Sequence, residues 1–549
     1  MRRREQDSDP EEEIGKDIRR ILNGENVREG ADERAGQSAR AQNSRPQMTP
    51  PPENARDVRE REKARRRAEK ELARRRNRER RKRNGPYVFI TYAFVALFIV
   101  LVIHLIYFQL HMKDDILNSP YNKRQDSAAE YVTRGEITTE DGIVLAKTDT
   151  SGDGTESRTY PYGREYCHVI GFTTHGKSGL ESKENYLLLT AHNNVFDQII
   201  NAFTGKKNPG DTVVTTLNAG LQDAAYHAMG NYQGAIVALD PATGEIKVMV
   251  SQPTFDPNTL ASDWDSMVAD SSNSQLLNRA TQGLYAPGST FKMVTTLAYF
   301  DKYRTLDGFH YDCTGEFPVG NITVHCYDGA VHGELDFTGA FAHSCNTSFS
   351  QIGLDVGNAA LTKAAKKMLF GAKLPSDITA SKSRWSLTDA SGDADLVQTA
   401  FGQGQTLVTP YHMALIVSSI ANNGVLMTPH LVKEVTNDAG SPVTETAVEA
   451  NRKLLNTDEA SVLQNLMRAV VTDGTARALS DRSYEAHGKT GSADYVKGDG
   501  SVGTHSWFAG YANKDGRSLV VVVLAEDGGA GSTTAVPMAA SVFDTYFGG

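Results

Sequence analysis

The longest uninterrupted apolar stretch of the chain covers residues 87–110, which contain no Asp, Glu, Lys or Arg. As a helix these 24 residues extend for roughly 36 Å, enough to cross the hydrocarbon core of a bilayer. A basic run, residues 61–83, lies directly upstream. Because Lys and Arg beside a membrane span stay in the cytoplasm, we predict a transmembrane helix over 87–110, with the N-terminus inside and everything after about residue 111 outside.

Further along, short apolar runs alternate with turn residues. Residues 235–239 and 245–251 flank Asp240-Pro241-Ala242-Thr243-Gly244, which predicts strand, turn and strand. A largely helical pattern then continues to about residue 430. Three more strands are predicted at about residues 485–495, 505–512 and 518–525. Strands at both ends of a helical middle predict an α/β fold, in which helices pack around one antiparallel sheet.

These patterns divide the 549 residues, more than one typical domain, into four parts. Residues 1–86 are polar and poor in aromatics, which predicts disorder, although the basic run within them is also compatible with a charged helix. The other three parts are the transmembrane helix at 87–110, a small pedestal of short strands and helices at 112–232, and a larger domain at 233–549. No signal-peptidase site follows the apolar stretch, so we expect the chain to stay anchored.

Charge is distributed unevenly along the chain. Residues 1–86 contain 26 Lys and Arg against 18 Asp and Glu, whereas the rest of the chain has 32 against 49. An acidic exterior argues against nucleic-acid partners. The basic tail is suited to lie against anionic lipids of the inner leaflet.

Three short motifs carry the chemistry. They are Ser289-Thr290-Phe291-Lys292, Ser344-Cys345-Asn346 and Lys489-Thr490-Gly491, separated by about 50 and then about 140 residues. Taken singly, each has an ordinary interpretation: a helix start, a turn and a surface turn. All three in this order indicate an acyl-transferring serine enzyme whose base is a lysine.

The first motif places a hydroxyl and an amine one helical turn apart. At positions i and i+3, Lys292 can reach the Ser289 hydroxyl and take its proton. Residues 291–300 are mostly apolar, which predicts a buried helix with Ser289 at its N-terminus, where free N–H groups favour an oxyanion. A lysine acts as a base only when burial or a second cation lowers its pKa, and Lys489 is the candidate cation.

The other two motifs complete this site. Ser344 can relay a proton to the leaving group, and Asn346 can orient Lys292 and a substrate amide. Lys489 starts a predicted strand in which Gly491 allows close backbone approach. An exposed edge there would bind a peptide substrate as an added strand.

The chain resembles a monofunctional (class B) penicillin-binding protein, a peptidoglycan D,D-transpeptidase with the serine penicillin-recognising fold. Besides the three motifs, the resemblance rests on Arg134-Gly135-Glu136-Ile137, Gly179-Leu180-Glu181, Asn278-Arg279-Ala280 and Gly402-Gln403-Gly404, and it extends from about residue 131 to the C-terminus. Two positions depart from the family pattern. Ser492 stands where many relatives have Thr, and Thr138-Thr139-Glu140 stands where an Asp-Arg pair is common.

The resemblance implies a role for each motif residue. Ser289 would be the acyl acceptor, Lys292 its base, and Ser344 and Asn346 the proton relay. Lys489 and Thr490 would bind the terminal carboxylate of a stem peptide. Gly491 and Ser492, which follow them on the strand, would also belong to the substrate-binding residues. The N–H groups of Ser289 and Ser492 would form the oxyanion hole.

The resemblance also implies partners. These are peptidoglycan stem peptides on lipid-linked glycan strands, β-lactams that acylate the serine, and a membrane glycosyltransferase of the SEDS type. No cofactor is implied.

Four other functions use similar residues. A D,D-carboxypeptidase would give the acyl-enzyme to water, a class D-like β-lactamase would hydrolyse penicillin quickly, a β-lactam sensor would only signal, and a scaffold would have an inactive site. The pedestal favours the transpeptidase. The sequence does not separate roles in elongation, division or sporulation.

All four cysteines lie in the predicted exterior part: Cys167, Cys313, Cys326 and Cys345. The 13-residue interval between Cys313 and Cys326 makes a local disulfide our first prediction among three pairings. We interpret Cys345 as a small buried side chain. No Cys-x-x-Cys or His-Glu-x-x-His motif is present, so the sequence predicts no metal site.

Overall fold

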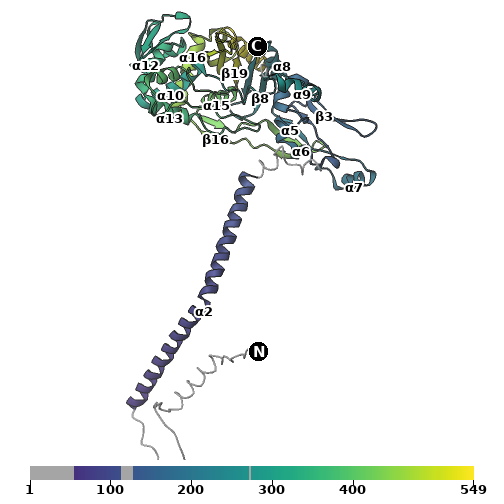
Figure 1. Ribbon diagram of the computed structural model, residues 1–549, viewed down its shortest axis with the longest axis vertical. Coiled ribbons are helices and arrows are strands. Elements are labelled where there is room, and N and C mark those ends of the chain that lie inside the picture. Colours follow the sequence, from purple (N-terminus) through teal and green to yellow (C-terminus); the bar gives the residue numbers. More distant parts are fainter. Residues whose placement is uncertain (1–54, 113–127, 271–273, 549) are drawn as a thin grey trace, which may run out of the picture. The chain divides into compact units, whose positions relative to one another are not determined.

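The computed structural model describes residues 55–112, 128–270 and 274–548 (Figure 1). Its first element is the 57-residue helix α2 (Ala55–His111). Within it, Asn84–Leu110 contain an 18-residue stretch whose mean hydropathy is 2.7 and of which no part is buried. Among the described residues, this is the one helix whose length and composition suit it to cross a membrane.

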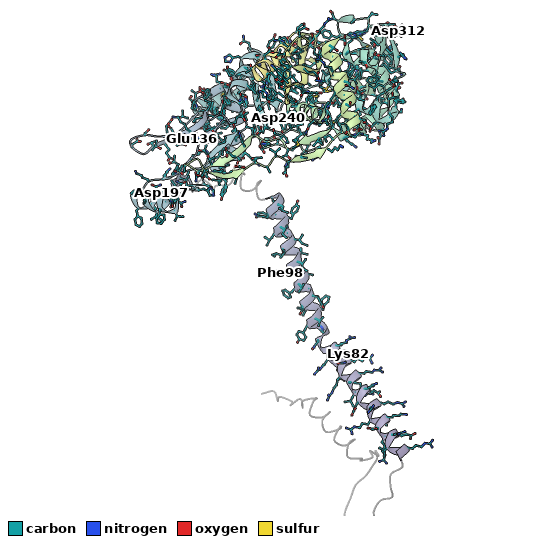
Figure 2. The ribbon with its side chains drawn as sticks, turned by 180° about the vertical axis from the view of Figure 1, so that it is seen from behind. Lys82, Phe98, Glu136, Asp197, Asp240 and Asp312 are labelled. Carbon is teal, nitrogen blue, oxygen red and sulfur yellow. The ribbon has the colours of Figure 1, made fainter. Side chains whose placement is uncertain are left out.

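The two halves of α2 carry different side chains. Figure 2 shows nitrogen-bearing side chains around Lys82 and apolar side chains around Phe98. In the charged half, Arg65 and Glu69 form an i,i+4 ion pair at 3.2 Å. The disorder predicted for residues 1–86 is wrong for residues 55–86, because they form the charged helix that the basic run also allowed. Residues 1–54 lie outside the described part.

A five-stranded antiparallel sheet forms the centre of the main body. Its order is β17 (Glu485–Val496), β18 (Val502–Lys514), β19 (Arg517–Ala525), β7 (Gly234–Leu239) and β8 (Ile246–Gln252). The predicted assembly of one sheet from distant segments is confirmed. Every residue of β7 and β8 is buried, because helices cover both faces of the sheet.

Three helices pack on this sheet. Helices α8 (Ala219–Met229) and α17 (Ala535–Phe547) contact each other and pack against β8 and β19, respectively. Helix α15 (Pro410–Ala421) packs against β7, β18 and β19. Its first 11 residues are buried, so α15 lies in the core between the sheet and the helical region.

The helical region contains the first two motifs. Its helices are α10 (Lys292–Tyr303), α11 (Phe337–Ala342), α12 (Asn346–Val356), α13 (Asn358–Lys367), α14 (Asp393–Ala400) and α16 (Thr457–Thr472). The segment also holds two small strand pairs. They are β9 (His310–Cys313) with β12 (Gly333–Asp336), and β10 (Glu316–Val319) with β11 (Ile322–His325).

The pedestal is built on a second sheet of six strands. In order they are β15 (Pro442–Glu445), β14 (Val432–Thr436), β6 (Thr212–Thr215), β2 (Ile137–Thr138), β3 (Val144–Thr150) and β4 (Glu156–Thr159). Two of these strands, β14 and β15, come from beyond the predicted boundary at residue 232. The predicted domain limits stay predictions, and this sheet joins the two parts.

A buried ion pair links two motifs of the pedestal. Glu181, on α5 (Gly179–Lys183), is fully buried. It accepts hydrogen bonds from Arg134 Nε at 2.6 Å and from Arg158 Nε at 2.7 Å. Arg134 and Glu181 therefore lie together although 47 residues separate them in the chain.

Candidate active site

Ser289 lies on a 3₁₀ turn, η3 (Gly288–Phe291), that continues directly into α10. Gly288 has a φ of +54° and donates its N–H to Gly402 O at 2.9 Å. A Cβ on Gly402 would lie 1.7 Å from Gly288 O, so glycine is needed there for the chain to pass. Ser289 is buried, with 9% of its surface exposed. The predicted buried helix with Ser289 at its start is confirmed.

Lys292 is completely buried at the first turn of α10 and is held by the second motif. Its Nζ donates to Ser344 O at 2.6 Å and to Asn346 Oδ1 at 2.8 Å, and lies 3.3 Å from Ser344 Oγ. Asn346 Nδ2 donates to His325 O at 3.1 Å, which fixes the orientation of the amide. Ser344 and Asn346 thus face Lys292 together.

These contacts suit a neutral amine. The carbonyl of Ser344 and Oδ1 of Asn346 can only accept, so they use two N–H bonds, and a neutral amine has two. Its lone pair then remains for a hydroxyl. Burial lowers the pKa of Lys292 to about 7, while the thiols of Cys345 and Cys326 act in the opposite direction. The amine is therefore poised to exchange a proton near neutral pH.

No hydrogen bond joins Ser289 Oγ to Lys292 Nζ within the described residues. The two side chains are three residues apart at the junction of η3 and α10. Such contacts between nucleophile and base are often long before substrate binds and shorten in the complex. The structure thus brings the amine to the second motif and leaves the hydroxyl within one turn of it.

The third motif lies in the middle of β17. Lys489 is completely buried, and its Nζ donates to Ser344 Oγ at 2.8 Å. Among the described residues, no carboxylate lies within ion-pair distance of Lys489. Burial, and secondarily the charge of Lys292, lowers its pKa well below the usual value. A buried amine without a counter-ion is suited to bind an incoming anion.

Strand β17 is an edge strand, as the sequence predicted for the third motif. It packs against η3: a Cβ on Gly491 would lie 3.3 Å from Pro287 O and from Thr290 Cγ2. A Cβ on Gly288 would likewise lie 3.0 Å from Ser492 O. The residue before Ser289 therefore contacts Ser492, which brings both predicted oxyanion-hole residues to one place.

Known proteins match both parts of the main body. The family model described as "Penicillin binding protein transpeptidase domain" matches residues 234–544. The chain belongs to the class B penicillin-binding proteins. The model described as "Penicillin binding protein A dimerisation domain" matches residues 134–213 of the pedestal. The family assigned from the motifs is confirmed, and the enzyme is a serine-type D-Ala-D-Ala transpeptidase.

Individual relatives agree with this family. The peptidoglycan D,D-transpeptidase PbpA of Mycolicibacterium smegmatis is 31% identical over 458 residues, which are 80% of this chain and 92% of the relative. The ceftriaxone acyl-enzyme complex of penicillin-binding protein A from M. tuberculosis has a TM-score of 0.69 and 28% identity, covering 77% of this chain and 99% of its own. A D,D-transpeptidase domain from Eggerthella lenta has a TM-score of 0.68 and 30% identity, covering 76% of this chain and 98% of its own. The predicted penicillin-recognising fold is confirmed.

This penicillin-binding protein has site residues that motif reasoning did not assign. Thr475 Oγ1 lies 2.6 Å from Thr490 Oγ1 and thereby orients that side chain. The rings of Phe349 and Phe341 lie 5.2 and 5.6 Å from the Nζ atoms of Lys292 and Lys489, respectively. No local pattern marks Thr475 or the two phenylalanines, because only the fold brings them to the motifs.

The predicted disulfide between Cys313 and Cys326 is wrong. All four cysteines of the penicillin-binding protein are free and buried, and the two sulfur atoms lie 3.7 Å apart. Cys345 Sγ lies at the same 3.7 Å from Cys326, so three thiols meet where the sequence suggested a pair. Cys345 is buried, as predicted, and it also caps α12 by accepting the N–H of Ser348.

Proposed function

We propose that this protein is anchored in the membrane and cross-links peptidoglycan stem peptides through an acyl-enzyme on Ser289. The observation that carries this proposal is the meeting of two buried lysines at one hydroxyl. Ser344 Oγ lies 3.3 Å from Lys292 Nζ and 2.8 Å from Lys489 Nζ. Lys292 is placed for proton transfer and Lys489 for anion binding. The reaction needs both functions at one site.

Acylation begins with the donor peptide along β17. Its terminal carboxylate binds Lys489 and Thr490, which places the D-Ala-D-Ala carbonyl beside Ser289. Neutral Lys292 takes the proton of Ser289 Oγ as that oxygen attacks the carbonyl carbon. The N–H groups of Ser289 and Ser492 stabilise the oxyanion that forms.

Collapse of this intermediate breaks the amide bond. The proton on Lys292 passes through Ser344 Oγ to the departing nitrogen, and D-Ala leaves as a free amine. The donor remains as an ester on Ser289. An amine of a second stem peptide then attacks the ester, its proton returns to Ser289 Oγ through Lys292, and the cross-link forms.

β-lactams would be captured by the same groups. Ser289 Oγ attacks the carbonyl of their strained amide, the C–N bond of the four-membered ring breaks, and the leaving nitrogen takes the proton but stays tethered to the acyl group. A relative at 28% identity has been solved as a ceftriaxone acyl-enzyme, which supports this step for the present chain. The outcome should be a long-lived covalent adduct.

Mass spectrometry of the intact protein tests the nucleophile. After mixing with penicillin, we expect one adduct on Ser289 and none in Ser289→Ala. The exposed Ser441→Ala is the matched control and should acylate normally. An adduct on another residue, or rapid loss of the adduct with hydrolysed penicillin, would replace the proposal with a different nucleophile or a β-lactamase.

The acceptor decides between the transpeptidase and the alternative D,D-carboxypeptidase. We would incubate the full chain with a stem peptide ending in D-Ala-D-Ala and a labelled D-amino acid. A transpeptidase forms the labelled amide, whereas a carboxypeptidase releases only the shortened acid. The pure acid product would assign the alternative function.

The anchor and the pedestal would bring a SEDS-type glycosyltransferase to the enzyme. Helix α7 (Val195–Thr204) supports a partner at the pedestal, because Phe196 and Phe203 are 74% and 88% exposed. Figures 1 and 2 place this helix, marked by Asp197, at the end of the main body opposite α12 and Asp312. Photo-crosslinking from position 203 in living cells should capture the polymerase, and adding Phe196→Glu on the same helix should prevent it. The exposed Val448→Glu is the control. Crosslinks without any polymerase would exclude this partner.

A further inference from the structure

Four side chains that the reaction does not use lie in one cluster beside the second motif. They are Cys313 at the end of β9, Cys326 after β11, His332 before β12 and Cys345 at the start of α12. Their sulfur atoms and one ring nitrogen all lie within 4.8 Å of one another. The three thiols are buried and His332 is half-buried. Four soft donors converge here from four separate segments.

The separations match a tetrahedron around a metal ion. Zinc bonds sulfur at about 2.3 Å and nitrogen at about 2.1 Å, so tetrahedral neighbours lie about 3.8 Å apart for two sulfurs and about 3.6 Å for sulfur and nitrogen. The Cys313–Cys326 and Cys326–Cys345 sulfur pairs are each 3.7 Å apart, and Cys313 Sγ lies 3.3 Å from His332 Nδ1. A disulfide would instead need about 2.05 Å.

Neighbouring groups donate to the sulfurs. Cys345 Sγ accepts the N–H of Ser348 at 3.4 Å and its hydroxyl at 3.0 Å. Cys313 Sγ accepts the hydroxyl of Thr347 at 3.2 Å. Such donors stabilise thiolates and orient metal ligands.

We propose that Cys313, Cys326, His332 and Cys345 bind one Zn²⁺ ion through three thiolates and one imidazole nitrogen. Three sulfurs and one nitrogen in a closed, four-ligand arrangement are typical of structural zinc and unsuited to Mg²⁺ or Ca²⁺. The intervals between the ligands are 13, 6 and 13 residues. The sequence predicted no metal site, because these intervals differ from Cys-x-x-Cys spacing and only the fold brings the ligands together.

The ion would fix the position of the second motif. Cys345 lies between Ser344 and Asn346, and Ser344 has the unfavourable φ of +59°. Asn346 donates to His325 O, next to ligand Cys326. Among the described residues, no hydrogen bond joins the four ligands to Lys292, whose Nζ contacts Ser344 and Asn346. Their role is therefore positioning, and it rests on the functions proposed for Ser344 and Asn346.

Zinc would also protect the thiols. Free cysteines outside the cytoplasm are prone to form disulfides. Three of them within 4.8 Å would oxidise readily unless a metal held them. Zinc has no redox chemistry and would keep the cluster reduced in the exterior location that the sequence predicts.

Metal content tests the site directly. The full chain, purified in detergent without chelators, should contain about one zinc per molecule by plasma mass spectrometry. Cys326→Ser should lose it, and His332→Cys should retain it with four sulfurs. Cys167→Ser, a buried cysteine outside the cluster, is the matched control and should stay fully loaded. Wild-type protein without zinc, even after dialysis against it, would overturn the proposal.

Two measurements on the wild type do not depend on folding of the variants. Replacement of zinc by Co²⁺ should give a thiolate-to-cobalt charge-transfer band. Alkylation after denaturation in chelator should label all four cysteines. A cross-linked peptide joining Cys313 to Cys326, or a cobalt spectrum without thiolate bands, would each refute the zinc site.

Acylation by penicillin separates positioning from stability. Below the melting temperature, zinc-stripped enzyme should acylate about 10–100-fold more slowly, chiefly in the rate of the chemical step, and added zinc should restore it. Unchanged acylation without zinc would exclude the positioning role. No acylation of zinc-loaded enzyme would instead count against Ser289 as nucleophile and leave the metal site intact.

Discussion

The pedestal and the active site both bury charge, in opposite ways. Glu181 in the pedestal and Lys489 in the active site are each fully buried. Glu181 is held between Arg134 and Arg158, whereas no carboxylate among the described residues approaches Lys489. Removing one partner of a buried ion pair strongly destabilises the fold, whereas a buried amine without a counter-ion is suited to bind an anionic ligand.

The pKa values follow the same division. Burial by itself would raise the pKa of Glu181, but Arg134 and Arg158 hold it below its usual value. In the active site no carboxylate among the described residues opposes burial, so the pKa of Lys292 falls to about 7. The pedestal therefore keeps its ions charged, while the active site favours a neutral amine that can act as a base.

The largest effect should come from removing the base. Lys292→Met should lower the rate of penicillin acylation by about 10²–10⁴-fold, because nothing else takes the proton of Ser289. Stopped-flow acylation measures this, with the melting temperature to check the fold. Lys302→Met, on the same helix but exposed, should acylate normally. If Lys292→Met were acylated at the wild-type rate, Lys292 would be excluded as the base.

The pedestal should respond in stability. Glu181→Gln should lower the free energy of unfolding by about 3–5 kcal/mol, because two buried guanidiniums lose their shared partner. Denaturant unfolding measures the loss, and acylation of the remaining folded protein should stay normal. The exposed pair of Lys147 and Asp149 is the control, and Asp149→Asn should leave stability unchanged. A similarly small effect of Glu181→Gln would end the contrast between the two regions.

The buried amine of Lys489 should show its role through the substrate. Lys489→Met should lower kcat/KM for a D-Ala-D-Ala peptide by about 10–150-fold, as expected for loss of a charged hydrogen bond. The same peptide with a methylated carboxylate is the control and should lose much less. Equal losses for both peptides would mean that Lys489 does not bind the carboxylate.

The last effect concerns pH, which changes the rate of the wild type without any substitution. Neutral Lys292 is the active form, so acylation should rise about tenfold per pH unit below pH 7 and level off above about pH 8. Lys489 faces the same hydroxyl, and the thiols of Cys326 and Cys345 lie nearby. Measuring the profile again in Lys489→Met therefore separates the titration of Lys292 from that of Lys489. A rate independent of pH between 5 and 9 would contradict a lysine base.

The spacing of the motifs is enough to identify much of the site. Ser289 and Lys292 are one turn apart in any helix, so their proximity follows from the chain itself. The hydrogen bond between Lys292 and Asn346 depends on where α12 begins. The motif predicts this contact only through resemblance to the family. Thr475 and Gly402 show the limit, because their contacts with Thr490 and Gly288 come from segments outside the three motifs.

The cysteines also show that spacing along the chain does not predict contacts between distant segments. A 13-residue interval suggested a pair, but the distance between two sulfurs depends on how β9, β11 and α12 pack. The six-stranded sheet was likewise not predictable from spacing, because β14 pairs with β6 of the pedestal although it lies beyond the predicted boundary.

The sequence alone determined the apolar helix, the strand pattern of the central sheet, the family and the order of the catalytic groups. These depend on local periodicity and on short spacings, which a linear chain carries in full. Only the tertiary structure decided that Lys489 is buried with no carboxylate near it among the described residues, that Glu181 is paired, and that three cysteines and a histidine share one cluster. Burial and charge pairing depend on contacts between distant segments, and those exist only once the chain has folded.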